Sequence, residues 1–368
     1  MALDFDRLIS VCVDGNASDI VLKTGAQPAI KRLGRILFIS DDPVTAEDME
    51  AVFQAIASQA DRDHFDRQGE VDFAFQHASQ GRFRVNLFRA GGQISAVMRQ
   101  IKSIIPSFQE LSLPERQFCH LGQLERGLVF ITGITGSGKS TSLAAVIDYI
   151  NGTRNKHILT LEDPIEYRFE DGLSIINQRQ VGNDTRTWLT GLRSAMREAP
   201  DVIMLGEIRD RETMEAAIAA AETGHLVLST LHTVNAVQTV ERVMTFFPPH
   251  QHDLIRLQLS MVLEGVVSQR LVPCVKEDRM VPAVEILMGS PRIREILKTG
   301  STPDLPHALE EGADYYGTQT FNMSLKSLHD AGLITIEEAC GASDAPDDLR
   351  LAIRGIVRGS GVRIMGRS

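Results

Sequence analysis

The sequence predicts an α/β fold in which a small mixed domain precedes a parallel sheet covered on both faces. Four short, unbroken apolar segments alternate with helical segments, as is typical of buried parallel strands. These segments are residues 128–131, 158–161, 202–205 and 226–228. A glycine-rich loop follows the first segment and precedes a helix expected from Ser140 to about Ile150. The chain has 368 residues, which is enough for two domains with separate cores.

The N-terminal part, residues 1–105, is expected to form the small mixed domain. Short apolar or alternating segments predict its strands. They are residues 20–22, 36–39, 71–75, 82–87 and 94–101. Thr45, with Asp48 three residues later, predicts the capped start of a helix that extends to Ala60.

Two prolines, Pro106 and Pro114, favour a linker at residues 106–117 after this domain. The parallel sheet then belongs to a core expected at residues 118–290. From Pro291 the sequence is more polar and predicts a helical segment and tail at residues 291–368. The tail is basic and is interpreted as a solvated terminus. Its arginines are Arg350, Arg354, Arg358, Arg363 and Arg367.

Composition argues against several classes of protein. The formal net charge is −10 and only 5% of the residues are aromatic, so a nucleic-acid partner is not expected. The cysteines lie far apart without a C-x-x-C pair, which argues against a zinc ribbon or a disulfide framework. They are Cys12, Cys119, Cys274 and Cys340. The first ten residues lack the apolar segment of a secretory signal, and no stretch of about 18 apolar residues is present, so we expect a cytoplasmic protein.

The strongest motif is Gly133–Ser140, which matches G-x-x-x-x-G-K-[ST] in full. Glycines let backbone N–H groups converge on phosphate oxygens, and the N-terminus of the following helix adds partial positive charge. Lys139 is expected to reach the β- and γ-phosphates of a nucleoside triphosphate, and the Ser140 hydroxyl to ligate Mg²⁺. The residues expected to bind the nucleotide are Gly133, Thr135, Gly136, Ser137, Gly138, Lys139, Ser140 and Thr141.

Carboxylates follow two of the apolar strands at the edge where α/β sheets place their ligands. Glu207 follows residues 202–205 and is expected to hold an attacking water, or to order Mg²⁺ through a water; a helix cap is the alternative. Glu162 and Asp163 follow residues 158–161 and are expected to face the metal and the water, with Glu162 a candidate metal ligand. For this pair the alternative is a polar turn.

Two histidines, His225 and His232, bracket the apolar strand at residues 226–228. A histidine can form a hydrogen bond with a γ-phosphate or a catalytic carboxylate, and so respond to the presence of the phosphate. Taken alone, a histidine satisfied within the sheet is the simpler interpretation.

Together these motifs resemble the secretion ATPase superfamily, whose members carry a Walker A loop, an Asp box, a Walker B box and a His box. The four boxes correspond here to Gly133–Thr141, Thr160–Tyr167, Val202–Asp210 and Gly224–Thr233. Within the superfamily the sequence is most similar to the PilT/PilU branch, the retraction motors of type IV pili. A single small domain starts near Met1, a tetracysteine zinc element is absent, and residues 317–321 precede a helix and Gly332.

The resemblance implies a RecA-like P-loop ATPase core, a PAS-like α+β domain before it and a C-terminal helical segment. It implies ATP hydrolysis with Mg²⁺ in a homohexameric ring at the cytoplasmic face of the inner membrane. The partner would be an inner-membrane pilus platform protein. It also implies that Arg84 and Arg99 approach the phosphates of a neighbouring subunit, which neutralises charge developing on the transferred phosphoryl group. The alternative for these arginines is a solvated basic face shared with Arg82.

The sequence departs from the family pattern at three places. Ile134 stands where the family usually has proline, and Ala199 replaces a frequent acidic residue. Residues 292–298 lack a clear match to the family motif, so the choice between a main and an accessory retraction motor stays open. Other functions also stay open: an assembly or secretion ATPase of a type II or type IV secretion system, a nucleotide-gated module with little turnover, and a nucleic-acid translocase.

Overall fold

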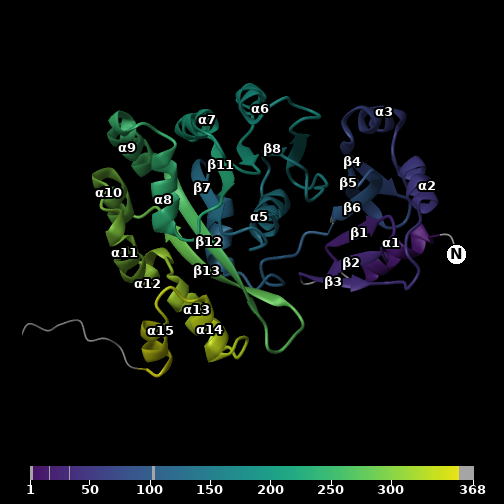
Figure 1. The fold of residues 1–368 in the computed structure, drawn as a ribbon. Coiled ribbons are helices and arrows are strands. Elements are labelled where there is room, and N and C mark those ends of the chain that lie inside the picture. The colour runs from purple at the N-terminus through teal and green to yellow at the C-terminus, as the bar shows by residue number, and fades with distance from the viewer. Residues whose placement is uncertain (1–2, 16, 33, 102–103, 356–368) are drawn as a thin grey trace, which may run out of the picture. The chain divides into compact units, whose positions relative to one another are not determined.

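The structure is a computed structural model that describes residues 3–15, 17–32, 34–101 and 104–355 (Figure 1). The chain divides into two compact units. Unit 1 runs from the N-terminus to Ile104 and includes Glu166–Arg168, and unit 2 comprises the rest from Ile105. In the described ranges no helix is both long and apolar enough to cross a membrane. Three arginines of the basic tail, Arg358, Arg363 and Arg367, lie outside these ranges.

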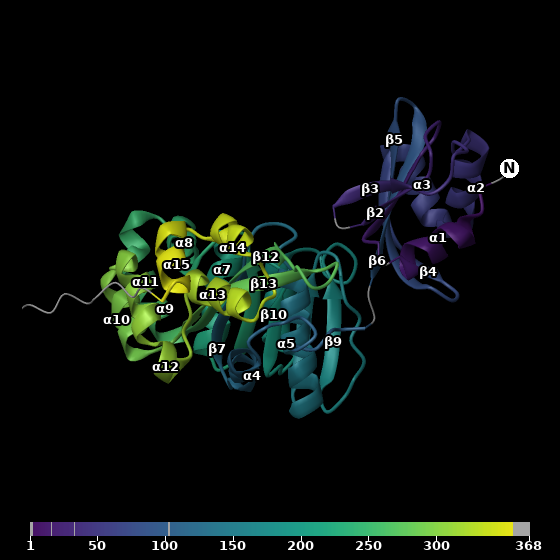
Figure 2. The same ribbon diagram turned by 90° about the horizontal axis from the view of Figure 1, so that it is seen from below.

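Unit 1 is an antiparallel sheet with strand order β3-β2-β1-β6-β5-β4, and its helices pack on one face (Figure 2). The strands are β1 (Asp19–Lys23), β2 (Ala29–Arg32), β3 (Arg35–Phe38), β4 (Glu70–His77), β5 (Gly81–Ala90) and β6 (Gln93–Ile101). The helices are α1 (Phe5–Asp14), α2 (Ala46–Ile56) and α3 (Gln59–Gln68). Their apolar side chains share one core with the sheet, in which Phe65 and Phe83 are fully buried.

The predicted helix start at Thr45 is confirmed, but the predicted end is wrong. Thr45 Oγ1 accepts a hydrogen bond from the backbone N–H of Asp48, whose carboxylate accepts one from the N–H of Thr45. The helix ends at Ile56 because Ser58 forms a second capping box, with Asp61, and starts α3. The five predicted strands of this unit are present, whereas the sequence does not predict α1, β2 or α3.

Unit 2 contains a seven-stranded sheet with strand order β13-β12-β7-β11-β10-β8-β9. All neighbouring strands are parallel except β12 and β13. The strands are β7 (Gly127–Thr132), β8 (His157–Glu162), β9 (Ile175–Gln180), β10 (Val202–Leu205), β11 (Leu226–Leu231), β12 (Leu263–Pro273) and β13 (Met280–Met288). The predicted apolar segments are β7, β8, β10 and β11, so these strands and their parallel arrangement are confirmed.

Helices cover both faces of this sheet, as the sequence predicts. Side chains alternate along β7: Leu128 and Phe130 join one core, and Val129 and Ile131 join the other. One face carries α4 (Glu115–Gln123) and α5 (Lys139–Thr153). The other carries α6 (Trp188–Ala195), α7 (Arg211–Glu222), α8 (Ala236–Thr245), α9 (His252–Val262), α10 (Pro291–Thr299) and α11 (Leu305–Glu311), with short 3-10 helices at Pro249–Gln251 and Thr302–Asp304.

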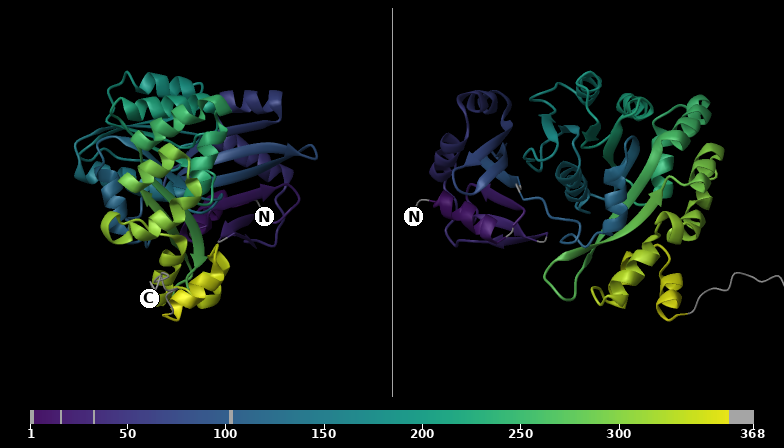
Figure 3. Two further views of the ribbon diagram at one scale, coloured as in Figure 1. Left: turned by 90° about the vertical axis from the view of Figure 1, so that its left-hand side faces the viewer. Right: turned by 180° about the vertical axis from the view of Figure 1, so that it is seen from behind.

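The C-terminal helices pack beside the end of β12 and the start of β13, where these two long strands are joined (Figure 3). After α12 (Ala313–Tyr316) they are α13 (Phe321–Asp330), α14 (Ile336–Ala342) and α15 (Pro346–Ile353). Residues expected in the linker belong largely to unit 2. Phe108 and Leu113 are buried in its core, and Glu115 starts α4.

Candidate functional site

The phosphate loop connects the fully buried strand β7 to α5. Gly136 and Gly138 have φ values of +80° and +89°, which is the left-handed region that glycine adopts without strain. Gly138 is the N-cap of α5, so Lys139 and Ser140 open the helix at its partially positive end. The sequence folds this way because an apolar strand, three glycines and a helix-forming segment follow one another directly.

The interior of the loop fits a phosphate group. A Cβ on Gly133 would lie 2.4 Å from Ser137 Oγ and 2.5 Å from the backbone oxygen of Gln269, so only glycine fits there. In the described part of the chain, Ser137 Oγ is one of four buried side-chain polar atoms without a hydrogen-bond partner. Lys139 is 8% exposed, and its Nζ donates to the carbonyl oxygens of Gly133 and Ile134 at 2.8 and 2.9 Å. A buried hydroxyl donor and an ammonium group at a helix N-terminus suit an anion.

The carboxyl ends of the parallel strands bring most of the predicted site residues to one edge of the sheet. In strand order, β7 leads to the loop, β11 to His232, β10 to Glu207 and β8 to Glu162. Asp163 follows Glu162 and is exposed. The loop and the two box carboxylates therefore share the edge where α/β folds bind ligands.

Glu207 is held between its two neighbouring strands. The N–H of Gly206 donates to Leu161 O of β8 at 2.8 Å, and Thr230 Oγ1 of β11 donates to Gly206 O at 2.6 Å. The Glu207 side chain is 13% exposed. Its carboxylate contacts Arg209 Nη2 at 2.5 Å and His232 Nε2 at 3.3 Å. A carboxylate fixed in this way can accept a proton or orient a water at the sheet edge.

Glu162 is also fixed, and it is 6% exposed. Its Oε1 accepts hydrogen bonds from Thr160 Oγ1 at 2.7 Å and from Gln178 Nε2 at 3.1 Å. Donors on its own strand and on the neighbouring β9 therefore orient this carboxylate.

His225 does not lie at this edge of the sheet. The prediction that it contacts the γ-phosphate is therefore wrong for a nucleotide bound at the loop of the same subunit. It precedes β11, whose Leu226 pairs with Gly127 at the start of β7, whereas the loop follows the end of β7. Seven residues of extended chain place His225 roughly 20 Å from His232. Its Nδ1 lies 2.9 Å from Ala220 O, so it is a histidine satisfied within the fold.

Arg84 and Arg99 lie together in unit 1, as directly opposite residues on β5 and β6. Arg99 Nε donates to Oδ1 of the buried Asp19 at 2.8 Å. Arg84 Nε lies 3.5 Å from Asp72 Oδ1. Each arginine therefore has an acidic partner that offsets the repulsion between two like charges facing each other.

Sequence reasoning missed four residues that shape the site. Arg209 pairs with Glu207, Thr160 and Gln178 hold Glu162, and Gln269 packs against the loop. The available signal was polarity within apolar strands, as in the segment Ser268–Gln269 of β12. Of the departures from the family pattern, Ile134 is 62% exposed on the loop and so has no core packing to disturb.

Loop, strand-end carboxylates and parallel sheet together define a phosphate-loop ATPase. The family model of the Type II/IV secretion system protein matches residues 4–310, and the chain belongs to this family. The type IV pilus ATPase PilU of Pseudomonas aeruginosa is 38% identical over 352 residues, covering 96% of this chain and 92% of PilU. The type IV pilus retraction ATPase PilT of the same organism is 40% identical over 346 residues, covering 94% of this chain and all of PilT.

Solved structures agree with this assignment. The crystal structure of the pilus retraction motor PilT with bound ADP matches with a TM-score of 0.86 and 40% identity, over 95% of this chain and 99% of that chain. The ATPase DotB of Legionella pneumophila matches with a TM-score of 0.79 and 28% identity, over 95% of each chain.

Proposed function

We propose that this chain is an ATP-hydrolysing motor for type IV pilus retraction, which works as a homohexameric ring at the cytoplasmic face of the inner membrane. The observation that carries the proposal is the likeness to the PilT retraction motor along nearly the whole of both chains. The convergence of Lys139, Glu162 and Glu207 at one sheet edge supports turnover rather than binding alone.

ATP binds at the loop, where backbone N–H groups and Lys139 hold the phosphates. Ser140 would hold Mg²⁺, with Glu162 and, through a water, Glu207 as further candidate ligands, and the ion would supply charge neutralisation for the phosphates. Glu207 orients the attacking water, with Asp163 as an exposed acidic neighbour of Glu162. His232 contacts Glu207 and links its position to the presence of the γ-phosphate.

In the ring, Arg84 and Arg99 of a neighbouring subunit approach the same phosphates. Loss of the phosphate releases this contact, and the N-terminal domain, residues 1–105, moves relative to the core at 118–290. That motion acts on an inner-membrane pilus platform protein and removes pilin subunits. The net charge of −10 supports a protein partner over a nucleic acid.

The test is deletion of the gene in its own bacterium, followed by a count of surface pili and a twitching assay. The deletion strain is expected to keep or gain surface pili and to lose twitching. The wild-type gene should restore twitching, and a gene with Lys139→Ala should not. Loss of surface pili in the deletion strain would contradict retraction and indicate assembly. Normal pili with defective protein export would indicate a secretion ATPase.

A further inference from the structure

Gln269 is a buried polar residue beside the phosphate loop. It lies on β12, whose Ser268 pairs with Thr132 of β7, so Gln269 stands one residue further along, level with Gly133. It is 3% exposed. Burial of a primary amide is unfavourable unless its polar atoms have partners, so the contacts of Gln269 indicate its role.

Gln269 meets the loop and its helix at three points. Its Oε1 accepts a hydrogen bond from Ser142 Oγ, in the first turn of α5, at 2.9 Å. Its Nε2 lies 2.9 Å from the position that a Cβ on Gly138 would occupy. Its backbone oxygen lies 2.5 Å from the equivalent position on Gly133. Both ends of the loop therefore pack directly onto this one residue.

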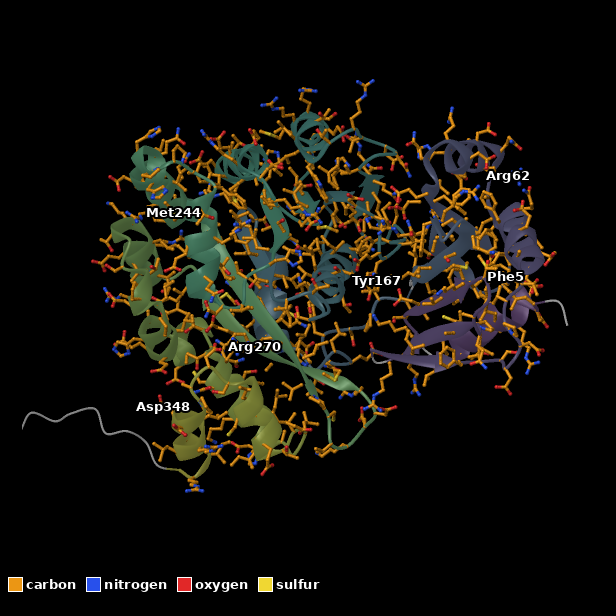
Figure 4. The ribbon with its side chains drawn as sticks, viewed as in Figure 1. Phe5, Arg62, Tyr167, Met244, Arg270 and Asp348 are labelled. Atoms are coloured by element: carbon orange, nitrogen blue, oxygen red, sulfur yellow. The ribbon has the colours of Figure 1, made fainter. Side chains whose placement is uncertain are left out.

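Neighbouring residues on β12 have a different task. Arg270 donates to Ala342 O at 2.6 Å and contacts Asp344 at 2.6 Å, and so faces the C-terminal helices (Figure 4). Ser268 accepts a hydrogen bond from Thr132 within the sheet. Of Ser268, Gln269 and Arg270, only Gln269 forms a side-chain hydrogen bond with α5.

We infer that Gln269 is a positioning residue for nucleotide binding, an inference that rests on the proposed function. Gln269 acts through Ser142 and the two glycines by fixing the directions of the loop N–H groups. A loop already held in its binding geometry loses little conformational entropy when a phosphate arrives. Loosening the loop therefore weakens nucleotide binding, whereas Glu207 keeps its position through β8 and β11.

The test is a double-mutant cycle on the full chain with Ser142→Ala, Gln269→Leu and the pair. Calorimetry with Mg-ADP gives the dissociation constant, and phosphate release gives KM and kcat for ATP. Each single change is expected to raise Kd and KM about ten-fold and to change kcat less than about two-fold, because an interaction common to ground and transition state is lost. The double change is expected to have about the effect of one, since both remove the same bond.

Ser324→Ala is the matched control. Ser324 Oγ accepts a buried hydrogen bond from the N–H of Val284, which pairs with Gln269 across β12 and β13, but Ser324 has no hydrogen bond to the loop. This variant is expected to lower Tm and to leave Kd unchanged. An unchanged Kd in Ser142→Ala would overturn the inference, and so would a double variant in which the effects of the two single changes multiply. If Gln269→Leu does not fold, the result for Ser142→Ala alone decides. A wild-type chain that neither binds Mg-ADP nor hydrolyses ATP would instead overturn the proposed function.

Discussion

His232 Nε2 lies 3.3 Å from Oε2 of Glu207, so a contact between two side chains joins the ends of the neighbouring parallel strands β11 and β10. The other oxygen of the same carboxylate contacts Arg209. Both partners are half-exposed or more, whereas Glu207 is nearly buried. The carboxylate is therefore the fixed member of the group, and its removal is the most direct test of hydrolysis.

Glu207→Gln is expected to retain nucleotide binding and to lower turnover by about a hundred-fold or more, since an amide of the same shape cannot act as a base. Phosphate release and Mg-ADP calorimetry measure the two properties. Glu215→Gln is the control, because Glu215 is an exposed residue of α7 paired with Arg211. Normal phosphate release by Glu207→Gln would refute the catalytic role.

The two histidines form a natural pair for comparison. His232→Ala is expected to lower turnover about ten-fold or more, because it loses the contact with Glu207, the proposed water-positioning carboxylate. His225→Ala is expected to leave turnover unchanged and to lower the free energy of unfolding by about 1 kcal/mol, through loss of its bond to Ala220 O. Equal losses of turnover in both variants would contradict the inference that only the histidine beside Glu207 affects hydrolysis.

Two glycines of the loop are expected to respond differently to alanine. In Gly133→Ala the new Cβ meets Ser137 Oγ and the backbone of Gln269, so we expect loss of Mg-ADP affinity by at least about ten-fold. A Cβ on Gly136 meets no atom within 4 Å, so Gly136→Ala is expected to add only the backbone strain of a positive φ, about 1–2 kcal/mol. Its loss of Mg-ADP affinity should therefore be smaller than that of Gly133→Ala. Calorimetry on both variants separates the two effects, and a smaller loss for Gly133→Ala than for Gly136→Ala would contradict the packing argument.

Glu285 on β13 is expected to make stability depend on pH. Burial raises the pKa of this carboxyl from 4.5 to about 7, although the N–H of Ala236 and nearby Arg270 oppose the shift. The folded state therefore binds this proton more tightly than the unfolded state does. The protonated Glu285 carboxyl contributes its full stabilisation of the fold below pH 4.5, and this contribution is lost as the pH rises through 7. The loss amounts to about 3 kcal/mol.

Glu285→Gln keeps an oxygen acceptor for Ala236 and removes the titration. Denaturant unfolding between pH 4.5 and 8 is expected to show a falling free energy of unfolding in the wild type and a flatter profile in the variant. Parallel profiles for the two proteins would contradict the assignment to Glu285.

Local signals account for most of what the sequence predicted. The strands of the parallel sheet are unbroken apolar segments, and the loop is contiguous, so neither depends on distant residues. Gln269 was missed because its partner Ser142 is 127 residues away and the contact exists only once β12 pairs with β7. The expectation that both histidines approach the γ-phosphate fails for His225, because the six-residue strand between His225 and His232 places them at opposite ends of the sheet.

The order of strands in unit 2 has a consequence for protein engineering. β11 lies between β7, which carries the loop, and β10, which carries Glu207, and it pairs with both over most of its length. The spacing between the loop and Glu207 is thus set by β11, which also contributes Thr230 and leads to His232 beside Glu207. A designer who grafts this chemistry onto another scaffold must transfer the three strands together in their native register, because loop and carboxylate alone carry no information about their separation.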